Sequence, residues 1–288
     1  IAVKRIGMLL VPRVLGSAVY QINIFVDTIV ASLAWIVGAG GVAALYYANR
    51  LIQFPLAIFG LAIAQAALPK MSQEYSSGDI DRLKDTLSFS MRVVFLVMIP
   101  ASIGLAVLGK PIIRILFERG EFTPYSTSIT YSALFFYSFG LFAYSGIKLL
   151  VTCFYSMRDT MTPVKTASLA VLMNIVLNLL LTRPMKLGGV ALATSISATF
   201  NCIFLYILLR KKIGAMDTRR IINSLLRVLA AGIVMALALA AMVARMPGLN
   251  IATLFISIIL GTVIFTGAAY LFDVRELKDF FLWISRKR

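Results

Sequence analysis

A few polar side chains stand inside long apolar stretches of this sequence, at spacings that suit ion binding. Asp27 is the only acidic residue within such a stretch, and Asn23 precedes it by four residues, so the two side chains share one face of a helix. Asn174 and Asn178 repeat this spacing later in the chain, and Thr194 follows in the next apolar stretch. Asp27 and the three later residues lie at similar depths, roughly 8–16 Å from one end of their stretches. We therefore expect these four residues to meet.

The chemistry of this group favours a particular kind of ligand. Oxygen ligands with a single carboxylate suit a monovalent cation better than a transition metal. A charge near the centre of a bilayer costs about 2.5–3.5 kcal/mol on insertion scales, so Asp27 requires a partner. A bound cation and ordinary hydrogen bonding between helices would each supply one. The residues leave both interpretations open.

Arg50 is a second charge set deep in an apolar stretch. It stands about 14 Å from the end of that stretch, too deep to snorkel easily, with Asn49 before it and Pro55 after it. Proline lacks a backbone N–H, so we expect a kink beside the arginine. A guanidinium matches phosphate in a bidentate manner, which favours an anion site at Asn49 and Arg50 over a structural ion pair with a residue such as Asp27. For Lys148, nearer the end of its stretch, snorkelling and substrate binding are equally good explanations.

The composition excludes several classes of protein. Hydrophobic residues make up 60% of the chain and charged residues only 14%, with a mean hydropathy of +0.91, which indicates lipid rather than water as the main solvent. The net charge of +16 would suit nucleic acid, but the basic residues sit in short segments between apolar runs, so we expect no nucleic-acid partner. The chain contains no histidine and no P-loop, and its two cysteines lie in apolar stretches. We find no catalytic constellation and expect no enzyme activity and no catalytic residues.

The apolar stretches predict an all-α, polytopic membrane protein. A helix that crosses the hydrocarbon core needs about 20 predominantly apolar residues. Eight stretches qualify: 13–38, 41–69, 91–109, 126–156, 163–182, 188–209, 222–245 and 250–272. Between the second and third stretches, Ile80, Leu83 and Leu87 recur at helical spacing within the polar segment 72–90, which predicts an amphipathic helix on the membrane surface.

The basic residues predict the orientation and an internal boundary. Twenty of the 28 Lys and Arg residues fall on one side of the predicted spans and six on the other, so the positive-inside bias places both ends of this chain in the cytoplasm. The segment 214–223 is polar and strongly basic. It divides the chain into a six-span unit, 1–213, and a final pair of spans, 214–288.

Three motifs resemble the MurJ (MviN) family of lipid II flippases. They are Tyr46-Tyr47-Ala48-Asn49-Arg50-Leu51 with Phe54-Pro55-Leu56, the segment Pro111–Thr123 (PIIRILFERGEFT), and the segment Phe154–Lys165 (FYSMRDTMTPVK). The resemblance implies two six-helix lobes of the MOP exporter type, followed by two further helices. On this basis residues 1–213 form the second lobe, residues 214–288 form the extra pair with a basic cytoplasmic tail, and the N-terminal lobe is absent from this chain.

The same resemblance implies functions for the polar residues. Family members have a cationic central cavity, and Arg50 matches one of its arginines. Some members have a sodium site whose ligands match Asp27, Asn174, Asn178, Thr194 and the backbone carbonyl of Val190. The chain departs from the family pattern at two positions. Asn49 stands where the family often has aspartate, and Asn178 stands where a sodium-binding member has a carboxylate. The second departure bears on the affinity for sodium.

The function implied by the resemblance is transport across the bacterial inner membrane. The expected substrate is the undecaprenyl-pyrophosphate-linked peptidoglycan precursor lipid II, moved from the inner to the outer leaflet by alternating access and driven by the membrane potential and a cation. The expected partners are lipid II, membrane lipids and the N-terminal lobe, and no cofactor is expected beyond sodium. Two alternatives remain: a flippase for another lipid-linked oligosaccharide of the O-antigen type, and a non-transporting membrane scaffold for cell-wall synthesis.

Overall fold

The computed structural model describes residues 18–19, 21–245 and 250–278, and this part of the chain contains helices and no strands. After a first helix, Gln21–Ser32, the elements are α2 (Ala34–Val37), α3 (Gly41–Pro55), the π-helical η1 (Leu56–Leu61), α4 (Ala62–Ser76), α5 (Ile80–Phe117), α6 (Pro124–Ser138), α7 (Leu141–Ser156), α8 (Met161–Met185), α9 (Leu187–Ile213), α10 (Thr218–Arg245) and α11 (Ile251–Leu271). The predicted all-α membrane fold is confirmed.

The long helices account for most of the predicted spans. Six apolar helices within the described residues are long enough to cross a bilayer, with α3, η1 and α4 together forming the first of them. A seventh span is counted if α6 and α7 are taken together, although a bend of 48° separates them. The first predicted span, 13–38, begins outside the described residues, and its described part is the helix Gln21–Ser32 followed by α2.

The break between α6 and α7 corrects the prediction of one continuous span over 126–156. Gly140 lies at this break, where the backbone approaches α9 closely. A Cβ atom added to Gly140 would lie 2.8 Å from the Ser195 hydroxyl oxygen and 2.8 Å from the Tyr144 ring. The missing side chain therefore permits the close contact, a signal that hydropathy does not carry.

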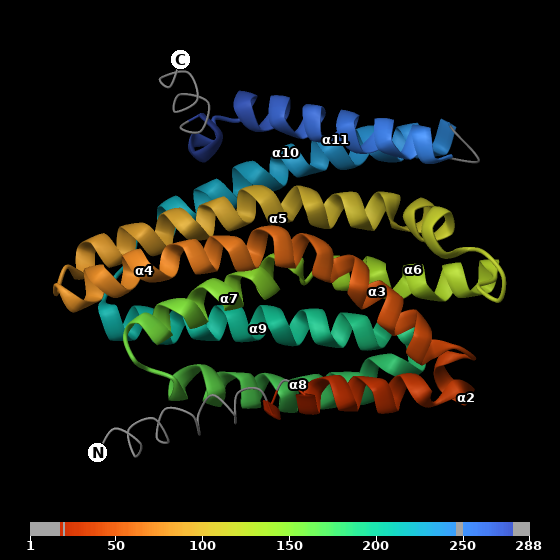
Figure 1. Ribbon diagram of the computed structural model, residues 1–288, viewed down its shortest axis with the longest axis horizontal. Helices are drawn as coiled ribbons and strands as arrows, with labels where there is room; N and C mark the ends of the chain where they lie inside the picture. Colours follow the sequence, from red (N-terminus) through yellow and green to blue (C-terminus); the bar gives the residue numbers. More distant parts are fainter. Residues whose placement is uncertain (1–17, 20, 246–249, 279–288) are drawn as a thin grey trace.

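The kink expected beside Arg50 takes the form of a π-helical segment. Pro55 ends α3, and η1 begins at the next residue. Proline donates no backbone hydrogen bond and crowds the carbonyl four residues earlier. The backbone hydrogen bonds after Pro55 therefore follow the wider π-helical pattern. Figure 1 shows the chain changing direction between α3 and α4.

The predicted surface helix over 72–90 is wrong. Residues up to Ser76 belong to α4, and α5 begins at Ile80, where the Asp79 side chain accepts a hydrogen bond from the Arg82 backbone N–H. Leu83 and Leu87 are fully buried. Their apolar face packs against other helices of the bundle rather than against the membrane surface, which periodicity alone does not distinguish.

The helices pack side by side, with α5 near the middle of the view and the last two helices along one edge (Figure 1). α10 packs along α5, and α11 along α10. At the opposite edge, α8 packs along α9, and α2 lies beside α8. α5 has 38 residues and is about 57 Å long, well beyond the ~30 Å hydrocarbon core. The boundary between 1–213 and 214–288 stays a prediction, although Met216 and Ile221 join the same buried core as the earlier helices.

Candidate functional site

The structure brings Asp27 together with residues of α8 and α9. Asp27 is 5% exposed. Its carboxylate accepts a hydrogen bond from Asn178 Nδ2 on Oδ1 at 2.8 Å and from the Thr194 hydroxyl on Oδ2 at 2.9 Å. Asn23, one turn earlier on the first helix, has its Nδ2 3.4 Å from Oδ2. Side chains 151 and 167 positions apart from Asp27 thus meet on one carboxylate.

Asn174 and Val190 complete this group. The Asn174 amide lies 3.1 Å from the Thr194 hydroxyl and 2.9 Å from Asn178 Nδ2. Turning that amide by half a revolution places its nitrogen 3.1 Å from Asp27 Oδ1 and its oxygen against Thr194. The carbonyl oxygen of Val190 lies 3.1 Å from the Thr194 hydroxyl oxygen. We call Asp27, Asn174, Asn178, Val190 and Thr194 the Asp27 cluster.

One acceptor oxygen of the Asp27 cluster lacks a hydrogen-bond donor within the described part of the chain. Asn178 is 1% exposed, and its Oδ1 has no hydrogen-bond partner among the described residues. A buried acceptor without a donor is costly, so this oxygen calls for a ligand. One carboxylate with amide, hydroxyl and carbonyl oxygens fits a hard monovalent cation. No group of three His, Cys, Asp or Glu residues suited to a metal occurs among the residues searched, which are those the structure describes.

Arg50 lies on the exposed side of α3, one turn before the π-helical segment. Its Nη2 donates to the Tyr46 hydroxyl at 2.9 Å, and its guanidinium carbon lies 4.8 Å from the centre of that ring. No carboxylate lies within ion-pair distance of Arg50 in the described part of the chain, and Asp27 is bonded to α8 and α9 instead. A stacked guanidinium with free donors is therefore presented at the surface of this chain.

The other two proposed substrate residues lie apart from the Asp27 cluster. Asn49, beside Arg50 on α3, accepts a hydrogen bond from Gln53. Lys148 is exposed on α7. Among the described residues, Lys148 shares no hydrogen bond with Asn49 or Arg50, and a common site of the three stays a prediction.

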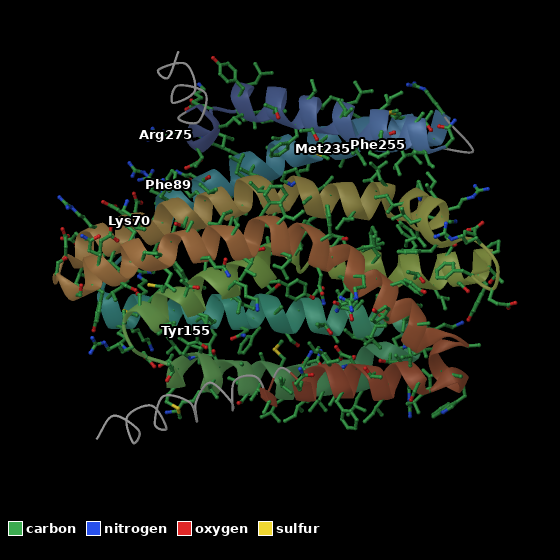
Figure 2. All side chains as sticks on the ribbon, in the orientation of Figure 1. Lys70, Phe89, Tyr155, Met235, Phe255 and Arg275 are labelled. Atoms are coloured by element: carbon green, nitrogen blue, oxygen red, sulfur yellow. The ribbon has the colours of Figure 1, made fainter. Side chains whose placement is uncertain are left out.

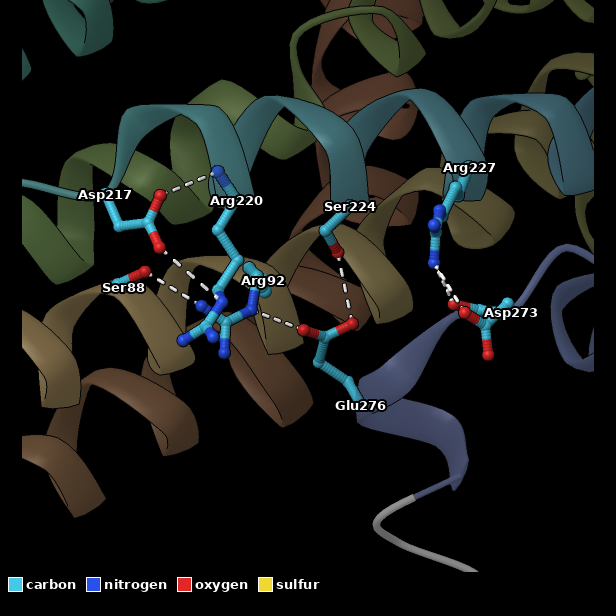
Figure 3. A network of polar contacts seen from close by, with 8 residues as sticks. All are labelled: Ser88, Arg92, Asp217, Arg220, Ser224, Arg227, Asp273 and Glu276. Carbon is cyan, nitrogen blue, oxygen red and sulfur yellow. Dashed lines mark hydrogen bonds and ion pairs between the residues drawn. The ribbon is translucent and has the colours of Figure 1, made fainter.

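The sequence analysis missed a network of buried charges in the first third of α5 (Figure 3). Arg92 of α5 forms an ion pair with Glu276, and its guanidinium also donates to Ser88 at 2.8 Å. Glu276 accepts a second hydrogen bond from Ser224 of α10 at 3.1 Å. The side chains of Arg92 and Glu276 are only 11% and 5% exposed. In the sequence, Arg92 is one of the basic residues that predict the cytoplasmic side. No local pattern indicates that Glu276, 184 positions away, is its partner.

Asp273 extends this network beyond the end of α11. Lys278 donates to its carboxylate at 2.7 Å and Arg227 of α10 at 3.1 Å. The hydrogen bond and charge of Lys278, followed by those of Arg227, lower the pKa of Asp273 below its ordinary value. The charges thus hold the segment after α11 against α10 and α5.

Comparison with known structures defines the class of protein. The chain resembles an outward-facing multidrug resistance MATE family transporter of the MOP superfamily with a TM-score of 0.60 and 19% identity, over 95% of this chain and 66% of that one. That likeness concerns the fold alone. A structure described as lipid II flippase MurJ in an inward closed conformation matches with a TM-score of 0.74 and 25% identity, over 90% of this chain and 52% of that one. The described fold is that of a MOP-type membrane transporter.

The sequence comparisons identify the family within that class. A family model described as lipid II flippase MurJ matches residues 2–261. A probable lipid II flippase MurJ of Vibrio cholerae serotype O1 is 40% identical over 204 residues, covering 71% of this chain and 38% of the relative. The chain therefore belongs to the MurJ family, a family of transporters and not of enzymes. It spans about two fifths to half the length of these two MurJ proteins. The resemblance inferred from the motifs is confirmed.

Proposed function

We propose that the complete protein flips lipid II, carrying the undecaprenyl-pyrophosphate-linked precursor from the inner to the outer leaflet of the bacterial inner membrane. Membership of the MurJ family supports this function. The observation that carries it in this chain is Arg50, a cation on a membrane-spanning helix with no carboxylate partner among the described residues. Such a group attracts a phosphate ligand, and its planar donors suit pyrophosphate oxygens.

The proposed mechanism is alternating access between this chain and the N-terminal lobe. Arg50 and Asn49 bind the head group, and Lys148 assists from α7. The π-helical segment after Pro55 lets α3 change its angle relative to α4 without breaking the span. The membrane potential favours export when the cytoplasm is negative, because moving two negative charges outward gains roughly 4–5 kcal/mol per 100 mV. Both ends of this chain lie in the cytoplasm in this proposal.

The Asp27 cluster supplies the proposed coupling site for sodium. Asp27, Asn174, Asn178, Thr194 and the carbonyl of Val190 would hold the ion through their oxygen atoms. A bound cation would neutralise the Asp27 carboxylate within the membrane. Because the cluster joins the first helix to α8 and α9, its occupancy would bias how these helices sit together.

The test is growth of cells depleted of their own lipid II flippase and supplied with the full-length protein. We expect Arg50→Ala to abolish growth support while Arg50→Lys retains part of it. Arg114→Ala is the matched control, because Arg114 is exposed at the far end of α5 and pairs loosely with Glu118 at 3.7 Å. All variants are checked for equal amounts in the membrane.

Two outcomes would contradict the proposal. Full growth support by Arg50→Ala would favour a scaffold that transports nothing. Failure of the unmodified protein, combined with flipping of an O-antigen-type lipid in vesicles, would identify a different lipid-linked oligosaccharide as the substrate.

A further inference from the structure

A groove of about 840 Å³ lies between α4 and α5, away from the Asp27 cluster and from Arg50. Its two ends differ in chemistry. Where α4 ends and α5 begins, it is lined by charged and hydroxyl side chains, among them Lys70, Glu74, Arg82 and Thr86. Further along both helices its walls are apolar. Figure 2 shows Lys70 and Phe89, one from each helix, toward the same end of the molecule.

Glu74 is the unusual residue in this groove. Its side chain is 8% exposed although it lies near the end of α4. Oε1 accepts a hydrogen bond from the Thr86 hydroxyl at 2.8 Å, and Lys70 Nζ stands 3.9 Å away. Oε2 has no hydrogen-bond partner among the described residues. A buried carboxylate oxygen without a donor is costly, and rotation about the last side-chain bond presents either oxygen to a ligand.

The surroundings of Glu74 hold charges of both signs. Four of the twelve acidic residues of this basic chain fall within residues 74–85. Of these, Asp85 is exposed and lines the groove. Lys70 and Arg82 line the same end, with side chains 68% and 79% exposed, and Arg82 pairs with Asp79 at 3.2 Å. The groove thus offers acceptors for a cation beside donors for an anion.

The other end of the groove suits a hydrocarbon chain. Ile63 and Ala66 of α4 face Phe89 and Val93 of α5 across it. Ala66 is exposed, and Phe89 is 50% exposed. Both helices continue from here into their membrane-spanning parts, so this wall is continuous with the apolar depth of the bilayer.

We propose that this groove binds a glycerophospholipid with a primary ammonium head group, such as phosphatidylethanolamine. Glu74 accepts hydrogen bonds from the ammonium group, Lys70 and Arg82 neutralise the phosphate, and an acyl chain lies along Ala66 and Phe89. A quaternary ammonium has no N–H to donate, and the phosphatidylglycerol head group offers only uncharged hydroxyls to the Glu74 carboxylate, so the site distinguishes among these lipids. This proposal does not rest on the flippase function.

The experiment measures lipids retained by the full-length protein after extraction from vesicles of equal phosphatidylethanolamine, phosphatidylcholine and phosphatidylglycerol, by native mass spectrometry. The unmodified protein should retain phosphatidylethanolamine over phosphatidylcholine. Glu74→Gln keeps the shape and the acceptor for Thr86 but loses the charge, and should weaken that retention about tenfold. Glu121→Gln, an exposed charge change beyond the other end of α5, is the control and should change nothing.

A second variant separates the head-group contacts from the chain contacts. Ala66→Trp fills the apolar end and should reduce the retention of every lipid at this groove. Equal retention of phosphatidylethanolamine and phosphatidylcholine by the unmodified protein overturns the proposal without any variant. Preference for phosphatidylglycerol, or retention unchanged by Glu74→Gln, also overturns it.

Discussion

Asp27 is held by donors from two other helices, so its charge is tied to how those helices pack. The Asn178 amide and the Thr194 hydroxyl supply its strongest hydrogen bonds, and both residues offer oxygen as well as a proton donor. In the proposed sodium site, a change of rotamer would turn the Asn178 amide oxygen toward the ion in place of its nitrogen. We therefore expect the residue at position 178 to affect ion affinity in the proposed sodium site.

We expect Asn178→Asp to strengthen sodium binding about tenfold, which is about 1.4 kcal/mol. A second carboxylate beside Asp27 adds attraction for a cation, but the two charges repel each other when no ion is bound. The variant should therefore have a lower Tm than the unmodified protein without sodium and a larger rise of Tm when sodium is added. Thermal unfolding in NaCl against choline chloride measures both. A rise of the same size in the two proteins would remove position 178 from the site.

Asp159, in the turn between α7 and α8, is a carboxylate outside the membrane-spanning helices that is held by donors from α8 and α9. Lys212 of α9 donates to it at 2.6 Å, and the Thr162 hydroxyl at 2.7 Å. Partial burial acts to raise the pKa of Asp159, but the bonds from Lys212 and Thr162 together with the Lys212 charge outweigh it and lower the pKa below its ordinary value. The pair links the start of α8 to the end of α9.

A lowered pKa means that the stabilisation from Asp159 is complete above the ordinary carboxyl pKa of about 4 and is lost as pH falls through the lowered value. Asp159→Asn should therefore lower Tm near neutral pH, and the difference from the unmodified protein should shrink in acid. Thermal unfolding between pH 7 and pH 3 tests this. A difference that stays constant with pH would mean that the charge of Asp159 contributes nothing.

At the scale of the elements, close backbone contact governs how α8 turns into α9. A Cβ atom on Gly189 would lie 2.2 Å from the Leu181 carbonyl oxygen and 2.9 Å from the Thr182 backbone nitrogen. Backbone atoms cannot move aside as side chains do. The turn therefore requires glycine, and it places Val190 and Thr194 on α9 opposite the asparagines of α8.

Gly189→Ala should destabilise the protein by about 1–3 kcal/mol, and sodium should no longer raise Tm, because the added methyl group pushes α9 away from α8. Gly267→Ala is the matched control: nothing lies within 4 Å of its added Cβ on α11, so it should be neutral or stabilising by up to about 1 kcal/mol. Thermal unfolding of both variants decides the matter. Equal Tm values would show that the α8–α9 turn tolerates a side chain.

At the scale of the whole molecule, the final pair of helices is attached to the bundle by more than apolar contact. α10 packs on α5, and Arg92, Ser224 and Glu276 tie α5, α10 and the segment after α11 together (Figure 3). A buried ion pair is costly to break from one side only, since the remaining charge stays unpaired in a poorly hydrated place. The network therefore fixes where the last two helices sit.

Removing one partner by Glu276→Leu should destabilise this attachment by about 3–5 kcal/mol, whereas the double variant Arg92→Leu with Glu276→Leu should recover part of the loss. Asp217→Asn is the control, because its pair with Arg220 is half exposed, at 51% and 53%, and such pairs contribute about 0–1 kcal/mol. Tm and the rate of proteolysis between α9 and α10 measure the effect. A double variant that is no better than Glu276→Leu alone would contradict the account.

The sequence by itself determined the all-helical membrane fold, most of its spans and the identity of the polar residues within them. These depend on hydropathy, helical spacing and residue type, which are local properties. Asp27, Asn174, Asn178 and Thr194 could be grouped because depth along a helix is also a local count.

Only the tertiary structure decided which side chains share a partner. The pairing of Arg92 with Glu276, the burial of Glu74 beneath Thr86, and the break at Gly140 depend on how separate helices pack, and no spacing along the chain encodes that packing. Leu83 and Leu87 have the pattern of a surface helix, yet lie buried because neighbouring helices cover them. An apolar helix face is stabilised by removal from water, and the packing of the bundle decides whether lipid or protein buries it.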